Sequence, residues 1–229
     1  MTNAIIMASG LGTRMRPLTE TTPKPLIKVK GVPMIETVIN ALEEGNVDKI
    51  FVVVGYLGDQ FEYLTEKYQN VSIVRNAEYE TVNNISSIYA AREVLEKGNC
   101  YICEADLFVD DNSLFSNELT ETVYFGKMVE GVSSDWVFDL GLDGYITRVG
   151  KEGCDCFNMV GISFFKAKDA MILKSAIEEA YARPGHEDMF WDDVVNQNLD
   201  KLKIKINPVY EGQITEIDTV EELEAINGK

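Results

Sequence analysis

Short hydrophobic runs alternate with segments of helical hydrophobic spacing through the first half of the chain. The runs predict β-strands at about 3–8, 49–54, 71–75 and 99–105. Between them, hydrophobic residues recur at the three- and four-residue spacing of helices over 34–44, 58–68 and 85–97. This alternation is typical of βαβ units and a mostly parallel sheet. Because right-handed crossovers place the carboxyl ends of such strands at one edge, we expect a ligand site there.

The pattern changes after about residue 120, where strands predominate. Strands are expected at 122–129, 136–140, 145–149 and 159–165, with Asp143-Gly144 as a strong hairpin signal. Helices at about 167–182 and 187–198 precede strands near 203–210 and 213–217 and a short helix that Asp218 or Thr219 can cap. The sequence therefore predicts one α/β domain over 1–229, a Rossmann-like mixed, mostly parallel sheet flanked by helices, with a small β-rich part.

Composition and charge narrow the class of partner. With 45% hydrophobic residues, a chain of 229 residues can bury one sizeable core. Its formal charge of −17 argues against nucleic acid, whose phosphate backbone needs a basic surface. Residues 1–30 carry five basic residues against Glu20 alone, so this segment is +4 within a strongly acidic protein. A small anionic ligand is therefore expected near the N-terminal segment.

Hydropathy and cysteine usage predict a protein of a reducing compartment. No stretch approaches the roughly 20 apolar residues of a membrane span, and the apolar run at 4–8 is too short for a signal peptide. The cysteines are Cys100, Cys103, Cys154 and Cys156. A strand would point the first two to opposite faces, and the spacing of the second two is not that of a zinc site. We therefore expect free thiols, a cytoplasmic location and no membrane partner.

A glycine-rich loop follows the first predicted strand. It reads Gly10-Leu11-Gly12-Thr13-Arg14-Met15-Arg16-Pro17-Leu18-Thr19, and Thr22-Pro23-Lys24-Pro25-Leu26 comes shortly after. Glycines let backbone N–H groups approach phosphate oxygens, and two arginines with a lysine can neutralise a triphosphate. The Walker A pattern and G-x-G-x-x-G are both absent, which disfavours a kinase-type or dehydrogenase site. The loop is typical of a nucleotide-phosphate site, although a glycine turn with solvated cations would be the structural alternative.

This string resembles the signature of the nucleotidyltransferases that make activated sugars and activated alcohols, G-x-G-T-R-[LM]-x-P-L-T followed by P-K. Shorter motifs resemble those of the bacterial choline-phosphate cytidylyltransferases in that superfamily. They are Gly55-Tyr56, Asn83-Asn84 with Ser87, Glu104-Ala105-Asp106, Trp191-Asp192-Asp193 and Glu216-Ile217-Asp218. The resemblance covers essentially the whole chain. It implies a fold of the nucleotide-diphospho-sugar transferase type, with a nucleotide-binding half at 1–118 and an acceptor-binding half at 119–229.

The resemblance also implies a reaction and its partners. CMP would pass from CTP to phosphocholine with Mg²⁺ as cofactor, giving CDP-choline and pyrophosphate, and a homodimer is compatible with it. Cytidylyl transfer to 2-aminoethylphosphonate or phosphoethanolamine, and nucleotidyl transfer to a sugar 1-phosphate, remain alternatives. A non-catalytic nucleotide-sensing module is a further alternative. Such a module would not need Lys24, Asp106 and Asp218, which are all present here.

Two aspartates stand at the carboxyl ends of predicted strands. Asp106 and Asp218 are expected to hold Mg²⁺, with Glu216 as a helper, and the resemblance implies the same role. The alternative is that each aspartate only forms a turn or caps a helix. Lys24 is expected to place its charge on the α-phosphate and Arg14 to bind the leaving pyrophosphate. No protein nucleophile is needed, because the acceptor phosphate is already ionised at neutral pH.

Nucleotide binding is assigned to three segments by analogy with the family. Backbone groups of the first loop and polar side chains near 83–87 would read the base, although the asparagine pair is also a good helix N-cap. The assigned residues are Ala8, Ser9, Gly10, Leu11, Gly12, Thr13, Arg14, Lys24, Asn83, Asn84, Ser87, Glu104 and Ala105.

Two aromatic clusters are candidates for the acceptor site. A quaternary ammonium has no N–H to donate, so aromatic faces and a nearby carboxylate must hold it. The clusters resemble the pocket of the choline-phosphate family and comprise Asp135, Trp136, Phe190, Trp191 and Asp192. The alternative is that both tryptophans pack in the core. The sequence departs from the family at Val82 and Ser86, where the family is more aromatic, so primary-amine acceptors stay open.

Overall fold

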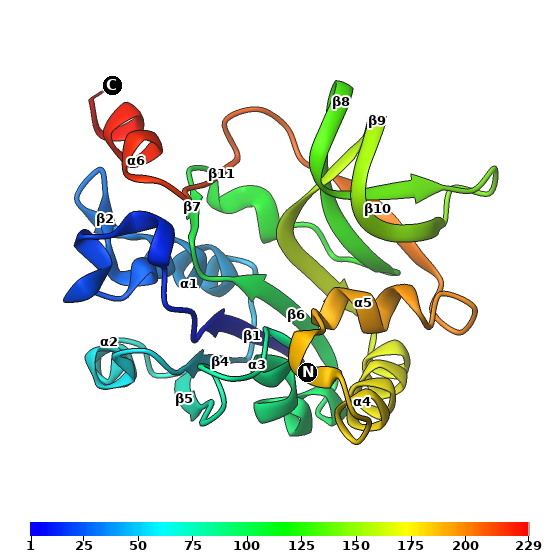
Figure 1. Ribbon diagram of the computed structural model, residues 1–229, viewed down its shortest axis with the longest axis horizontal. Coiled ribbons are helices and arrows are strands. Elements are labelled where there is room, and N and C mark those ends of the chain that lie inside the picture. The colour runs from blue at the N-terminus through cyan, green and yellow to red at the C-terminus, as the bar shows by residue number, and fades with distance from the viewer. Residues whose placement is uncertain (229) are drawn as a thin grey trace.

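The computed structural model describes residues 1–228, and its centre is a seven-stranded sheet with the order β10-β8-β9-β6-β1-β4-β5 (Figure 1). The strands are β1 (Thr2–Ala8), β4 (Lys49–Val54), β5 (Val71–Arg75), β6 (Asn99–Glu104), β8 (Thr122–Leu140), β9 (Ile146–Phe165) and β10 (Ile204–Pro208). β1 pairs in parallel with β4 and β6, whereas β9 runs antiparallel to β6 and β8. The predicted α/β class with a mixed, mostly parallel sheet is confirmed.

Helices cover both faces of this sheet. α1 (Met34–Glu44) and α2 (Tyr63–Lys67) pack on one face, and α3 (Ile85–Ala90), α4 (Ala167–Tyr181) and α5 (Trp191–Asn196) pack on the other (Figure 1). Neighbouring residues of β1 serve the two faces, because side chains alternate across a strand. Ile6 belongs to the core under α1, and Ile5 belongs to the core under α3 and α4.

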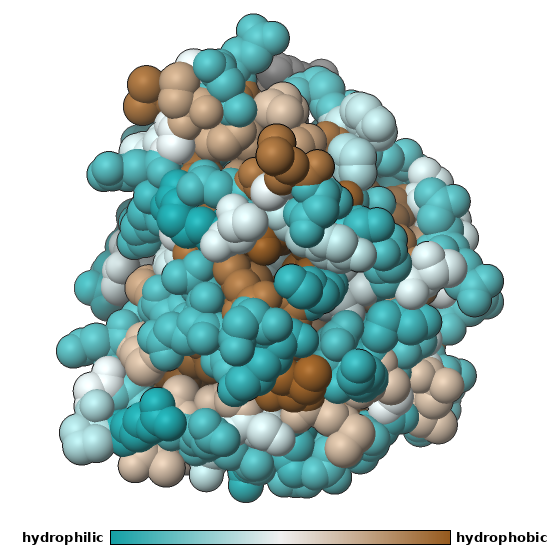
Figure 2. All heavy atoms as spheres, turned by 90° about the vertical axis from the view of Figure 1, so that its right-hand side faces the viewer, coloured by the Kyte–Doolittle hydropathy of each residue, from teal (hydrophilic) through white to brown (hydrophobic). Residues whose placement is uncertain are grey.

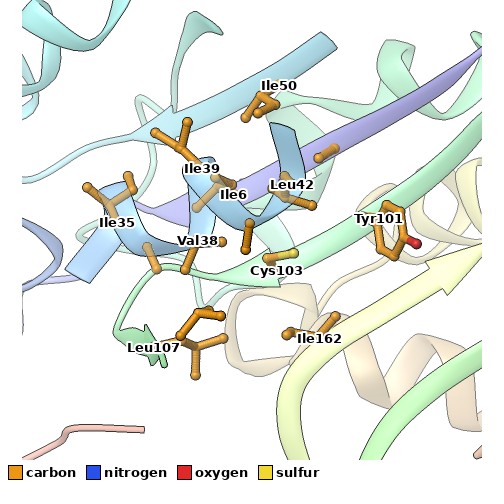
Figure 3. Close-up of a cluster of buried hydrophobic side chains, with 14 of the residues drawn as sticks. Ile6, Ile35, Val38, Ile39, Leu42, Ile50, Tyr101, Cys103, Leu107 and Ile162 are labelled. Atoms are coloured by element: carbon orange, nitrogen blue, oxygen red, sulfur yellow. The ribbon is translucent and has the colours of Figure 1, made fainter. Parts of the chain in front are cut away.

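The core between α1 and the sheet shows how the hydrophobic spacing forms this helix. Its fully buried residues include Ile35, Val38, Ile39 and Leu42, which lie over Ile6 and Cys103 (Figure 3). Burial of each such side chain contributes about 1.5–3 kcal/mol to folding. Cys100 lies in the core on the opposite face, and all four cysteines are free thiols.

The second half departs from the predicted strand lengths. The four short strands expected between 122 and 165 form two long strands, β8 and β9, which pair through several bulges. The hydrophobic alternation stops over residues 130–135, where Val132 is the one large hydrophobic side chain and is exposed. Backbone pairing continues there, so the prediction of a break was wrong. The hairpin signal at Asp143-Gly144 lies at the turn between the two strands, as expected. The helices expected at 58–68, 85–97 and 187–198 are each shorter α-helices joined to 3₁₀ turns.

The C-terminal segment returns to the carboxyl edge of the central strands. β11 (Ile214–Glu216) pairs antiparallel with β7 (Leu107–Val109), directly after β6. The short ribbon of β2 (Lys28–Val29) and β3 (Val32–Pro33) lies near α6 (Val220–Asn227), where the backbone N–H of Lys30 donates to the Asn227 side chain at 2.7 Å. Thr219 caps α6 in a capping box with Glu222. The segment after β11 therefore reaches the loop that follows β1.

The surface is mostly polar on the side that carries the β8–β9 hairpin. Figure 2 shows hydrophilic residues over most of this face, with hydrophobic residues in separate small patches. Within residues 1–228, no helix combines the length and the apolar character that a membrane crossing requires.

Candidate active site

A cavity of about 740 Å³ opens at the carboxyl ends of β1 and β6. The loop after β1, the turn after β6, the β8–β9 hairpin and the segment after β11 all contribute to its walls. The predicted residues that line it are Ala8, Ser9, Gly10, Gly12, Thr13, Arg14, Lys24, Asn84, Ser87, Glu104, Ala105, Asp106, Asp135, Trp136, Phe190, Glu216 and Asp218. Segments more than 200 residues apart in sequence, at Arg14 and Asp218, therefore meet in one cavity.

The glycine-rich loop owes its shape to Gly12. This residue has φ of 61° in the left-handed region, and a Cβ there would lie 2.9 Å from the Cβ of Lys24. Thr19 fixes the turn by donating from its hydroxyl to the Gly12 carbonyl at 2.8 Å. The hydroxyl of Tyr56 donates to the Thr19 carbonyl at 2.9 Å and supports the loop from the side of β4. The loop is thus held in place before any ligand binds.

Lys24 lies between two carboxylates at the floor of the cavity. Its Nζ is 2.5 Å from Oδ2 of Asp106 and 2.6 Å from Oδ1 of Asp218, and Arg14 Nη1 is 2.5 Å from Oδ2 of Asp218. Burial alone lowers the pKa of Lys24, but the two carboxylates outweigh it and raise that pKa. Partial burial raises the pKa of Asp218, yet Lys24 and Arg14 outweigh it and lower that pKa. Lys24 and Asp218 are therefore both charged at neutral pH.

A second group of carboxylates includes Asp106. Oxygen atoms of Glu104, Asp106 and Glu216 all lie within 4.8 Å of one another. Loss of solvent, followed by the like charges of Asp106 and Asp218, raises the pKa of Glu216 to about 8. Burial, followed by the charges of Asp106 and Glu216, also raises the pKa of Glu104. Crowded oxygen donors suit a hard divalent cation, whose charge would favour the ionised form of these carboxyl groups, and Lys24 already shows that a positive charge fits against Asp106.

The part of the cavity that carries the residues predicted to read the base is built from the loop after β1 and the start of α3. Ser9 donates from its hydroxyl to the Val53 carbonyl at 3.1 Å, and Ser87 reaches the Ser9 hydroxyl at 3.3 Å. Asn84 occupies the N-cap position of α3 without a side-chain cap hydrogen bond; its Oδ1 instead accepts from the backbone N–H of Trp191 at 3.0 Å. This contact connects the nucleotide side of the cavity to the start of α5.

The opposite wall carries the predicted acceptor residues Asp135, Trp136 and Phe190. The rings of Trp136 and Phe190 meet edge to face with centroids 5.3 Å apart. Asn158 donates to Oδ2 of Asp135 at 3.3 Å. An acidic group and two aromatic rings therefore stand together at the end of the cavity formed by β8 and α5.

Four predicted site residues lie outside the cavity lining. Trp191 is 3% exposed and packs against Tyr124 in the core, with ring centroids 5.9 Å apart. Asp192 is equally buried and accepts from the Tyr124 hydroxyl at 2.9 Å. Asn83 donates to the Asp188 carbonyl at 3.4 Å, and Leu11 points to the outer surface. The first turn of α5 directs the side chains of Trp191 and Asp192 into the core, so the structure does not bring these two predicted acceptor residues to the cavity lining.

The lining also includes residues that sequence reasoning did not select. Lys151 of β9, Ser134, Met159 and Glu222 line the cavity without belonging to a recognisable motif. Gly161 has φ of 72°, and a Cβ there would lie 2.9 Å from Oε2 of Glu104, so it leaves room for that carboxylate. The register of β9 against β8 and β6 brings Lys151, Met159 and Gly161 to the site.

Comparison with known proteins gives a consistent picture. Residues 3–130 match the family model for nucleotidyl transferase. The chain is 55% identical over 226 residues to the 2-aminoethylphosphonate cytidylyltransferase of Lancefieldella rimae. The aligned region covers 99% of this chain and 92% of that protein. It is 37% identical to the choline-phosphate cytidylyltransferase of Streptococcus pneumoniae, over 96% of this chain and 94% of that one. A solved structure of CTP:phosphocholine cytidylyltransferase from Streptococcus pneumoniae superimposes with a TM-score of 0.91 and 36% identity, covering 99% and 98% of the two chains.

Proposed function

This chain belongs to the nucleotidyl transferase family, and from that premise we propose that it transfers CMP from CTP to 2-aminoethylphosphonate and releases pyrophosphate. The observation that carries the proposal is the position of Lys24, buried beside the phosphate loop and between Asp106 and Asp218. A fixed positive charge there would stabilise the negative charge that gathers on the α-phosphate in the transition state. The relative that supports this acceptor is the Lancefieldella rimae enzyme.

The reaction needs alignment more than it needs a protein nucleophile. An oxygen of the acceptor phosphonate attacks the α-phosphorus of CTP, and the bond from that phosphorus to the bridging β-phosphate oxygen breaks. Pyrophosphate leaves with the electron pair. Arg14, whose side chain is largely exposed at the mouth of the cavity, is suited to bind the departing phosphates. The role of the fold is to hold the acceptor oxygen and the α-phosphate in line.

We propose Mg²⁺ as the cofactor. Asp106, Asp218 and Glu216 would hold it. Glu104 lies in one group of carboxylates with Asp106 and Glu216, and Asp218 is connected to Asp106 through their shared partner Lys24. When bound, the ion would supply positive charge to the phosphate oxygens. Lys24 remains the protein's own cation at this place, so its contacts with the two aspartates must rearrange as the ion and the nucleotide enter.

Phosphocholine is the second candidate acceptor. The aromatic rings of Trp136 and Phe190, with Asp135 beside them, are suited to an alkylated ammonium group. The Streptococcus pneumoniae relative supports this alternative at lower identity. Both candidates share the same nucleotide side, so the difference between them depends on one wall of the cavity.

The test is pyrophosphate release with four nucleoside triphosphates, each combined with 2-aminoethylphosphonate, phosphocholine, phosphoethanolamine and glucose 1-phosphate, with and without Mg²⁺. We expect turnover with CTP and 2-aminoethylphosphonate, dependent on Mg²⁺. A preference for phosphocholine would replace the acceptor and keep the nucleotide and metal proposals. Turnover only with the sugar phosphate would overturn the whole acceptor assignment. Activity in the presence of excess chelator would overturn the proposal that Mg²⁺ is the cofactor.

A further inference from the structure

Lys151 places a cation on the aromatic wall of the cavity. It lies on β9 opposite Trp136 of β8 in the strand register. Its Nζ is 5.5 Å from the centroid of the Trp136 ring and 5.2 Å from that of Phe190. Both distances fall within the roughly 6 Å range of an attractive cation–π contact. The two rings on which an alkylated ammonium would rest therefore already carry an ammonium of the protein.

The Lys151 ammonium has no carboxylate partner among residues 1–228. None of the ion pairs and none of the side-chain hydrogen bonds of the described chain involve its Nζ, whereas the nearby Arg148 is paired with Asp139. Lys151 is also an exposed residue that lines the cavity, so its charge faces the space where an acceptor would bind. The aromatic rings are thus the main contact that orients this ammonium.

The two candidate acceptors differ in how they respond to such a neighbour. A trimethylammonium group has no N–H, so it depends on aromatic faces, and Lys151 covers those faces. Charge repulsion by Lys151 acts on both acceptors alike and does not distinguish them. A primary ammonium has three N–H donors and can bind the Asp135 carboxylate directly, without the ring faces. Asp135 lines the same end of the cavity.

We propose that Lys151 is a specificity-determining residue that favours primary-amine acceptors over quaternary ammonium acceptors. The inference rests on the proposed function and deepens it, because it assigns the choice of acceptor to one side chain. It also explains how a wall with two aromatic rings and an aspartate can serve a substrate other than a choline compound.

The test is the ratio of kcat/KM for phosphocholine to kcat/KM for 2-aminoethylphosphonate in matched variants. Lys151→Met keeps the length of the side chain and removes its charge, and Lys151→Arg keeps the charge. Lys168→Met is the control, because Lys168 is an exposed lysine on α4 outside the cavity lining. We expect Lys151→Met to raise the ratio at least about tenfold, the effect of about 1.4 kcal/mol. Lys151→Arg and Lys168→Met should leave it near the wild-type value.

Several results would separate this inference from the proposed function. An unchanged ratio in Lys151→Met, with normal turnover of 2-aminoethylphosphonate, would overturn the role of Lys151 and leave the function standing. An equal change in Lys168→Met would show that net charge alone is responsible and would overturn it too. If the wild-type protein turns over neither amine, the proposed function fails first and this inference fails with it.

A binding measurement tests the same role without catalysis. Trp136 is one of only two tryptophans, and the other, Trp191, is 3% exposed in the core. Tryptophan fluorescence should therefore report on the aromatic wall during titration with phosphocholine. We expect tighter phosphocholine binding in Lys151→Met than in the wild type, and equal or weaker binding would contradict the proposal.

Discussion

Replacing the buried carboxylate of Asp192 by an amide should change how stability depends on pH. Asp192 lies under the acceptor wall, 3% exposed, with the Tyr124 hydroxyl as its hydrogen-bond donor. Burial raises its pKa from 3.8 to about 7, although the hydrogen bond from Tyr124 opposes this rise. The folded protein thus holds a proton at Asp192 over a range in which the unfolded chain has released it.

The sign and size of the effect follow from this difference. Where the folded state binds the extra proton, the free energy of unfolding falls as pH rises. The contribution of Asp192 is fully present below about pH 4 and is lost by about pH 7. At about 1.4 kcal/mol for each pH unit, the loss amounts to about 4 kcal/mol. In Asp192→Asn the side-chain carbonyl can still accept from Tyr124, but nothing titrates at this position.

The assay is urea unfolding of the wild type and Asp192→Asn at a series of pH values, followed by far-UV circular dichroism. The free-energy difference between the two proteins should move in favour of the variant by about 4 kcal/mol from about pH 4 to about pH 8. Asp200→Asn removes a carboxylate from an exposed position. Its free energy of unfolding should change with pH in the same way as that of the wild type. Parallel profiles for Asp192→Asn and the wild type would refute the assignment of a proton to Asp192.

Three further predictions concern the site and its support. Asp106→Asn should lower the rate of pyrophosphate release more than about 100-fold while the circular dichroism spectrum stays unchanged. The reason is that this carboxylate contacts Lys24 and lies beside Glu104 and Glu216. A near-normal rate would contradict a role of Asp106 in the reaction. Trp136→Ala should raise KM for the acceptor about tenfold and leave KM for CTP unchanged, and an equal rise in both would indicate a structural role. Thr219→Ala should lower the free energy of unfolding by about 1 kcal/mol through loss of the α6 cap, whereas an unchanged urea midpoint would show that the cap is dispensable.

Sequence reasoning succeeded where the signal is local or where topology is simple. The glycine-rich loop is local, since Gly12, Thr19 and Lys24 meet within one short segment. Asp106 follows β6 of the main sheet, and Asp218 follows β11, which pairs with β7 directly after β6, so the two predicted strand ends meet at Lys24. The ends of strands can be predicted from hydrophobic runs. Right-handed crossovers then place the carboxyl ends of parallel strands at one edge of the sheet.

The cavity wall that carries Asp135, Trp136 and Phe190 was harder to predict because it depends on side-chain direction and strand register. Phe190 and Trp191 are neighbours in sequence, yet the first turn of α5 sends one ring to the cavity and the other into the core. Lys151 reaches the wall only because its strand pairs with Trp136. Hydrophobic periodicity does not locate the first residue of a helix to better than about two residues. It also does not give the register of two strands that pair through bulges.

The pairing of β11 with β7 predicts that the site forms late in folding. All seven strands of the main sheet lie within residues 2–208, so that sheet can form before the segment carrying Glu216 and Asp218 arrives. Until then Lys24 has only Asp106 as a counter-charge at the cavity floor. The contact between Arg14 and Asp218 joins residues 204 positions apart in the sequence. Contacts between residues so far apart in sequence form slowly. Recovery of activity during refolding should therefore lag behind recovery of the circular dichroism signal, and the delay measures the time the last segment takes to dock.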